Sequence, residues 1–235
     1  MGSRLPHLRL ALIALLVTGC AQATAFSRTE RVPRPTGEVG VLLMQPDIEL
    51  YEITVAGLLE PKAEWTATAR EHVTTALRME LRGKNARLVP YQPPSQNPAK
   101  EQAHIQLVKL HDVVGGSILR HQYTPALVLP TKKDKFDWSL GQGVQILREE
   151  YDTEYGLFVL FRDSSASAGR KAMMVVAALG GIGIPGGTQV GFASLVDLRS
   201  GEILWFNRLI NPAGDLRTPE AARKAVQSLL ADLPL

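Results

Sequence analysis

The sequence predicts an α/β fold over residues 38–235, with a mixed sheet of about five or six strands and helices packed on it. Short apolar runs alternate along the chain with longer segments in which apolar residues recur every three or four positions, as strands and helices require. The chain has 235 residues, of which 45% are hydrophobic and 21% charged. This composition is typical of a globular domain and excludes a disordered chain or a polytopic membrane protein.

Six segments have the apolar pattern of strands. Residues 39–45 (VGVLLMQ) are almost continuously apolar, whereas residues 48–55 alternate apolar and polar side chains, and Pro46 separates the two. Residues 155–162 (YGLFVLFR) are apolar at successive positions, which indicates a central strand covered on both faces. The remaining strands are expected at residues 86–91, 189–198 and 202–210.

The last two strands are expected to form a hairpin. Gly201 stands in the turn between them, where a positive φ suits glycine. Trp205 and Phe206 are consecutive in the second strand, so their side chains should point to opposite faces of the sheet. A sheet covered on both faces would bury both.

Helical spacing of apolar residues predicts helices over residues 65–82 and 99–119. Gly115 and Gly116 should weaken the second helix and could break it.

Two further helices are predicted from their N-terminal signals. Ser139 with Gln142 fits a capping box. Thr218 as N-cap and Pro219 at the first helical position begin an amphipathic closing helix.

Residues 172–187 (AMMVVAALGGIGIPGG) contain no charged side chain, and two interpretations stay open. The first, which we favour, is a buried helix that covers the sheet. The second is a membrane-apposed or membrane-inserted element with Met173, Met174, Val175 and Val176 against lipid. The segment is shorter than the roughly 20 residues of a membrane-spanning helix, so it would insert within an oligomer or lie along the bilayer.

The motifs of the chain favour a protein that is not an enzyme and that has no metal and no dissociable cofactor. Residues 181–186 (GIGIPG) match the letters of a dinucleotide-binding loop, but that loop follows a strand and precedes a helix, the reverse of the order expected here. His104 and His111 are about 10 Å apart along one helix, too far to share a metal. We expect both histidines to be solvated or at the rim of the fold.

Residues 1–19 have the features of a cleaved signal peptide. Arg4 and Arg9 precede the apolar run of residues 10–17 (LALIALLV). Eight residues make about 12 Å of helix, far short of the ~30 Å hydrocarbon core of a bilayer.

Val17, Thr18 and Gly19 precede the only cysteine of the chain, Cys20, and this tetrapeptide resembles the lipobox of bacterial lipoproteins. The resemblance implies cleavage before Cys20, a diacylglycerol on its sulfur and an acyl chain such as palmitate on its amino group. Because Ala21 is not aspartate, it also implies sorting to the outer membrane, with the domain in the periplasm.

Residues 20–37 are then expected to form the lipidated N-terminus and a flexible tether, since they contain two prolines and few apolar side chains.

The charge of the chain does not favour nucleic acid as a partner. The formal net charge is +3, and Arg4 and Arg9 of the signal peptide carry two of these three charges. We therefore expect two partners: the membrane, through the lipid anchor, and another component of the cell envelope.

Residues 152–161 (DTEYGLFVLF) and 194–205 (SLVDLRSGEILW), followed by an amphipathic helix, resemble a domain shared by envelope lipoproteins. These include the curli secretion-channel lipoprotein and the lipoprotein activators of penicillin-binding proteins, and the whole pattern is similar to a wider group of proteobacterial lipoproteins. The resemblance implies a non-enzymatic accessory or assembly role. The alternative is a membrane-inserting homo-oligomer, similar to a secretion channel, built around residues 172–187.

Overall fold

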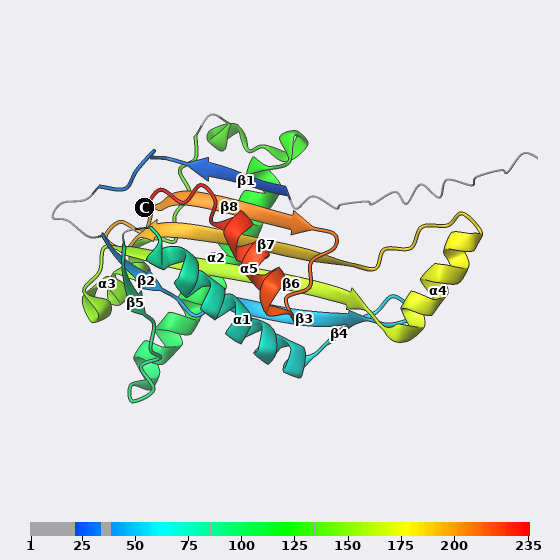
Figure 1. Cartoon of the computed structure of the whole chain (residues 1–235). Helices are drawn as coiled ribbons and strands as arrows, with labels where there is room; N and C mark the ends of the chain where they lie inside the picture. The colour runs from blue at the N-terminus through cyan, green and yellow to red at the C-terminus, as the bar shows by residue number, and fades with distance from the viewer. Residues whose placement is uncertain (1–21, 34–38, 85, 134) are drawn as a thin grey trace, which may run out of the picture.

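The computed structural model describes residues 22–33, 39–84, 86–133 and 135–235. They form one mixed sheet with helices on both faces, which confirms the predicted α/β class (Figure 1). The strands are β1 (Gln22–Ser27), β2 (Val39–Leu43), β3 (Asp47–Ile53), β4 (Leu59–Pro61), β5 (Ala86–Pro90), β6 (Tyr155–Ala166), β7 (Gly187–Asp197) and β8 (Ile203–Asn211). The helices are α1 (Ala63–Arg82), α2 (Pro98–Gln122), α3 (Gln145–Tyr151), α4 (Ala168–Leu179) and α5 (Pro219–Leu229).

The long strand β6 is the centre of the sheet, in the order β1-β8-β7-β6-β2-β5. On one side it pairs antiparallel with β7 along almost its whole length. On the other side it pairs in parallel first with β2, from Tyr155, and then with β3, from Leu160. Pro46 lies between β2 and β3, where it has no N–H to offer to a ladder, so the predicted division into two strands is confirmed.

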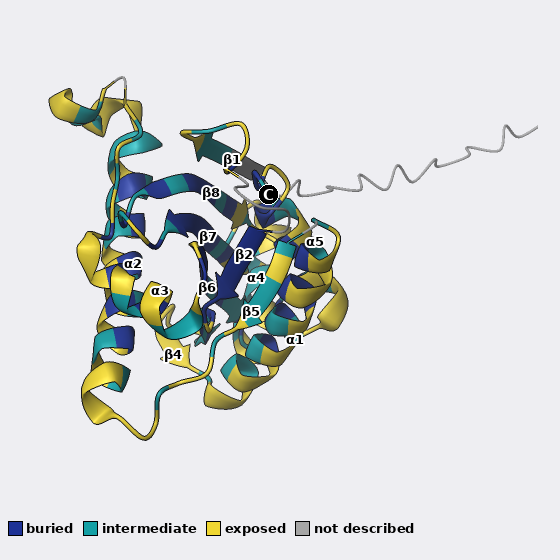
Figure 2. Cartoon of the chain, turned by 90° about the vertical axis from the view of Figure 1, so that its left-hand side faces the viewer, coloured by how far each residue is buried: buried dark blue, intermediate teal, exposed yellow. Residues whose placement is uncertain are grey.

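Both faces of the sheet are covered (Figure 2). Helices α1 and α5 pack on one face and helices α2 and α3 on the other, each over its own cluster of buried side chains. Trp205 belongs to the first cluster and Phe206 to the second, and both are fully buried. The expectation that these neighbours point to opposite, covered faces is therefore confirmed.

The flexible tether predicted for residues 20–37 is wrong over Gln22–Ser27. This segment is strand β1, which pairs antiparallel with β8 from Gln22↔Ile210 to Ser27↔Trp205. The ring of Phe26 meets that of Tyr123 edge to face at 4.9 Å. Together with the three-residue β4, which also was not predicted, β1 brings the sheet to eight strands. Residues 34–38 lie outside the described part of the chain.

One of the two predicted helix starts is confirmed. Thr218 Oγ1 accepts a hydrogen bond from the Ala221 N–H at 3.4 Å, and Pro219 is the first residue of α5. The capping box at Ser139 is wrong, because α3 begins only at Gln145. The Ser139 hydroxyl instead donates to the Gly201 carbonyl at 2.9 Å, at the tip of the β7–β8 hairpin, where Gly201 has the expected positive φ of 78°.

Helix α2 runs unbroken through Gly115 and Gly116, contrary to expectation. A Cβ on Gly115 would lie 2.1 Å from the Phe192 ring, so this glycine lets the helix approach the sheet closely. A Cβ on Gly116 would meet nothing within 4 Å.

This contrast predicts opposite effects of one substitution at adjacent positions. Gly115→Ala should destabilise the protein by about 1–3 kcal/mol, because Phe192 or the helix must move. Gly116→Ala should stabilise it by about 1 kcal/mol through helix propensity alone. Urea unfolding of the two variants measures both changes, and a Gly115→Ala protein as stable as the wild type would contradict the close approach of α2.

Candidate functional site

Helix α4 is the least ordinary element of the fold, because none of its twelve residues is buried. Val175, Val176 and Leu179 are 64%, 70% and 86% exposed. Figure 1 shows α4 beyond the ends of the strands, away from the helices that cover the sheet. The favoured interpretation of residues 172–187 as a buried helix that covers the sheet is therefore wrong.

The position of α4 follows from the strands that flank it. Strands β6 and β7 form an antiparallel pair that extends as far as Ser165↔Gly187, and α4 lies in the connection between them. Ser167 caps the helix by accepting a hydrogen bond from the Arg170 N–H at 3.2 Å. The Arg170 side chain then holds the returning loop by donating to the Pro185 carbonyl. The segment GIGIPG thus follows a helix and precedes a strand, as expected.

The turn between β3 and β4 lies beside the start of α4. The Ser167 N–H donates to the Ile53 carbonyl at 3.0 Å, and a Cβ on Gly169 would lie 2.7 Å from Val55 Cγ2. This turn and the start of β4 are also apolar and exposed, with Leu58 and Leu59 at 67% and 58%.

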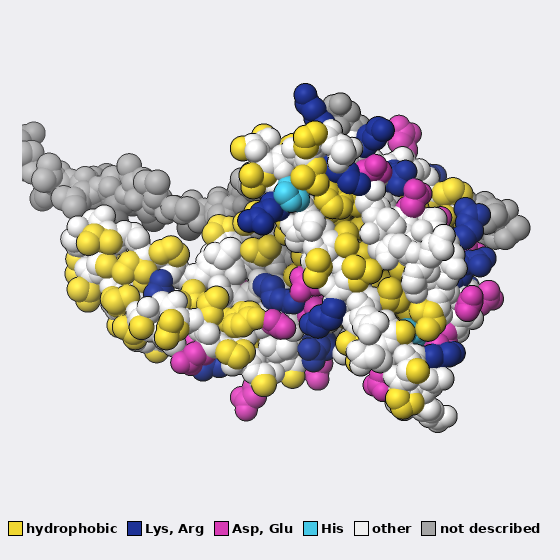
Figure 3. Space-filling model, turned by 180° about the vertical axis from the view of Figure 1, so that it is seen from behind, with side chains coloured by type: hydrophobic (Ala, Val, Ile, Leu, Met, Phe, Trp, Pro, Cys, Tyr) yellow, Lys and Arg dark blue, Asp and Glu magenta, His cyan; other side chains and the backbone are white. Residues whose placement is uncertain are grey.

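We call these two segments together the apolar lobe. It consists of Val55, Leu58, Leu59, Val175, Val176, Leu179 and Ile182, all more than half exposed. Figure 3 shows hydrophobic side chains gathered on the part of the molecule that projects at the left.

The four side chains proposed to face a membrane divide into two pairs. Val175 and Val176 belong to the exposed surface of the apolar lobe. Met173 and Met174 are half-buried, and Met174 Cε lies 3.0 Å from where a Cβ on Gly186 would stand, so it packs toward the returning loop.

The first residues of the described chain lie at the same end of the sheet as the apolar lobe. Gln22 pairs with Ile210 of β8, and Ile210 pairs with Val190 of β7, close to where β7 leaves the lobe at Gly187. Val17, Thr18, Gly19 and Cys20 lie outside the described residues. Cys20 precedes Gln22 by two residues, which can span at most about 7 Å.

The expectation that His104 and His111 are solvated or at the rim of the fold is wrong, because both side chains are buried. His111 Nε2 lies 2.9 Å from Ser194 Oγ, and burial lowers the pKa of His111 to about 3. His104 Nδ1 lies 3.2 Å from Tyr91 Oη, and burial lowers the pKa of His104 as well, against the opposing effect of Glu150. Both histidines are therefore neutral near pH 7, and each lies within hydrogen-bond distance of a hydroxyl group. Among the described residues, no group of three or more His, Cys, Asp or Glu side chains could hold a metal ion.

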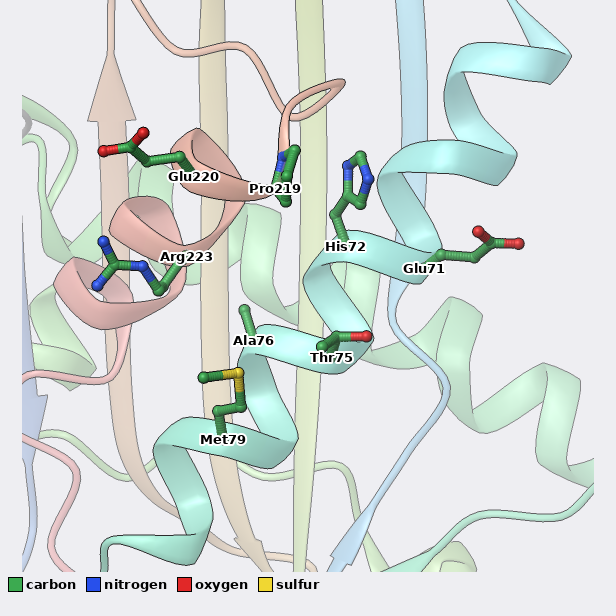
Figure 4. A pocket seen from close by; sticks show the side chains of 8 residues that line it. All are labelled: Glu71, His72, Thr75, Ala76, Met79, Pro219, Glu220 and Arg223. Carbon is green, nitrogen blue, oxygen red and sulfur yellow. The ribbon is translucent and has the colours of Figure 1, made fainter.

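A groove of about 370 Å³ runs between α1 and α5 (Figure 4). His72 lines it, and its Nδ1 lies 3.3 Å from the Leu216 carbonyl oxygen. Glu71 on α1 and Arg223 on α5 point away from each other, so the charged groups around the groove do not converge on one point. We therefore take the apolar lobe, rather than this groove, as the candidate site.

None of the described helices is long and apolar enough to cross a bilayer.

Comparison with known proteins does not show a family for this chain. No family model matches it. A segment of 55 residues is 38% identical to nuclear receptor subfamily 1 group I member 2 of Rattus norvegicus, a match that covers 23% of this chain and 13% of the receptor. Among solved structures, the PelC dodecamer from Paraburkholderia phytofirmans has a TM-score of 0.41 at 11% identity and covers 92% of this chain and 98% of PelC. A point variant of that dodecamer in another crystal form has a TM-score of 0.39 at 10% identity, over 92% of this chain and 99% of the variant.

Proposed function

We propose that this protein is an outer-membrane-anchored periplasmic lipoprotein that acts as a non-enzymatic accessory or assembly factor. It binds another component of the cell envelope through the apolar lobe. The observation that carries the proposal is the set of seven large apolar side chains exposed together at one end of the sheet. Contiguous exposed apolar surface of this kind marks interaction sites in folded proteins.

The physical argument is that α4 has little stabilisation of its own. A helix of twelve residues is marginal in water unless an apolar face packs against something. In the described chain the exposed face of α4 packs against nothing. Burial of each valine or leucine would contribute about 1.5–3 kcal/mol, so a partner that covers the lobe gains binding energy and orders the helix.

The second candidate is a membrane-inserting homo-oligomer built around residues 172–187. The same apolar lobe favours it, since several copies could present α4 side by side. Twelve residues make about 18 Å of helix, so one α4 cannot span a hydrocarbon core of ~30 Å.

The anchor is tested at its one cysteine. We expect Cys20→Ser to leave the precursor unlipidated and uncleaved, because the sulfur that accepts the diacylglycerol is gone. Cells labelled with radioactive palmitate should show label on the wild-type protein and none on the variant. Palmitate on the Cys20→Ser protein would contradict the proposed anchor.

Contact of the lobe with the envelope is tested by a photoreactive amino acid in place of Leu179, which is 86% exposed. The matched control places it at Val113, which is 67% exposed on α2. We expect adducts with an envelope protein or with lipid from position 179 and not from position 113. Adducts between copies of this chain would favour the homo-oligomer, and the absence of all adducts at 179 would contradict the proposed function.

A further inference from the structure

We infer that the component bound by the apolar lobe is the bilayer itself, the same one that holds the lipid on Cys20. In this arrangement α4 lies along the membrane surface with its exposed face among the acyl chains. The inference rests on the proposed function, of which it names the partner.

The first argument is the position of the lobe relative to Gln22, the first described residue. The register places Gln22 near the lobe end of β7, and two residues of chain keep Cys20 within about 7 Å of Gln22. The hairpin tip at Gly201 lies at the other end of β7, whose eleven residues span about 35 Å. A membrane in which the lipid on Cys20 is inserted therefore lies closer to the lobe end of the sheet than to the hairpin tip.

The chemistry of α4 is the second argument. Ala172, Val175, Val176 and Leu179 are exposed and follow helical spacing, so they form one apolar stripe. No charged residue occurs between positions 172 and 187. The basic residues Arg170 and Lys171 stand in the first turn, at the side of the lobe that adjoins the sheet. Basic residues beside an apolar stripe add electrostatic attraction to anionic lipids, which strengthens the binding of a helix that lies in the membrane interface.

The consequence is that the lobe orients the domain rather than retaining it. Several acyl chains on Cys20 already make the attachment essentially permanent. One attachment point leaves the domain free to turn, whereas the lipid and the lobe together hold the sheet with its hairpin tip away from the membrane.

The test uses the full lipidated protein in vesicles of phosphatidylethanolamine and phosphatidylglycerol. The diacylglycerol occupies the sulfur of Cys20, so Val176→Cys introduces the one free thiol of the chain. An environment-sensitive fluorophore on this thiol should emit at shorter wavelength and be quenched by lipids that carry a nitroxide on their acyl chains, because an interfacial helix lies about 5–10 Å deep. The control label at Arg199→Cys, on a largely exposed side chain beside the hairpin tip, should emit as in water and stay unquenched.

Two outcomes would overturn the inference in different ways. A water-like, unquenched label at position 176 together with protein adducts at position 179 would exclude the bilayer as partner and keep the proposed function. A water-like, unquenched label at position 176 without any adduct at position 179 would exclude both the bilayer as partner and the proposed function.

A matched pair of substitutions tests whether the stripe itself makes the contact. Val176 and Val113 are 70% and 67% exposed, each on a helix. Neither Val176→Asp nor Val113→Asp should lower the melting temperature. With the label moved to Leu179→Cys, only Val176→Asp should abolish quenching. A Val176→Asp protein that unfolds would show that α4 packs within the domain and would overturn the inference.

Discussion

Trp205→Ala and Phe206→Ala should each lower the free energy of unfolding by about 3–5 kcal/mol, although the two side chains are consecutive in one strand. Trp205 is fully buried in the cluster under α1 and α5. Phe206 is fully buried in the cluster under α2 and α3, where its ring stacks on that of Phe192 at 5.4 Å. Each truncation leaves a cavity in a different core, and urea denaturation measures both losses.

The control for this pair is Val113→Ala, which removes an exposed side chain and should change stability by less than about 0.5 kcal/mol. A silent change at either aromatic position would show that one face of the sheet is open, against the two-sided packing described above.

Acidification should destabilise the wild-type protein more than it destabilises a His111→Gln variant. Burial lowers the pKa of His111 to about 3, whereas an unfolded histidine has a pKa near 6.5. Below pH 6.5 the unfolded chain binds a proton that the folded chain excludes, so stability falls as the pH drops from 6.5 toward 3. At pH 5 this loss is about 2 kcal/mol relative to pH 7.

The comparison must be made as a difference between the two proteins, because Asp163 acts in the opposite direction. Burial raises the pKa of Asp163 to about 6. The folded protein therefore becomes less stable as the pH rises from 3.8 through 6 and this carboxyl is forced to ionise. Both proteins keep Asp163, and its effect cancels in the difference. Urea unfolding at pH 7, 6 and 5 should show the wild-type advantage shrinking with acid, and a constant difference would contradict a neutral, buried His111.

The elements that were predicted correctly depend on local pattern. The periodicity of residues 65–82 and the unbroken apolar run of residues 155–162 report which faces are buried, so α1 and β6 follow from them. Strand β1 could not be found in this way, because its pairing with β8 joins segments about 180 residues apart and, apart from Phe26, its residues are small or polar. The hydrogen-bond partner of the buried His111, Ser194, is likewise remote in sequence.

The apolar lobe shows a different limit of sequence reasoning. An uncharged apolar helix has the same composition whether it covers a sheet or faces lipid, so residues 172–187 allowed both interpretations. What separates them is the length of β6 and β7, whose pairing runs to Ser165↔Gly187 and places α4 past the covering helices. The register of β1, which places Gln22 at the same end, is also a property of the fold alone.

The pairing of β1 with β8 has a mechanical consequence. Tension applied through residue 20 from the lobe side would pull β1 along its own axis, antiparallel to β8. In that direction the inter-strand hydrogen bonds share the force and must shear together, whereas a pull perpendicular to the strands would peel them apart one by one. Two interactions of Arg28 hold the other end of the strand. Its N–H donates to the Leu204 carbonyl at 2.8 Å, and its side chain forms an ion pair with Glu202 at 3.0 Å. A pull on the N-terminal side of β1, directed along the strand, would thus load the pairing in its strongest direction.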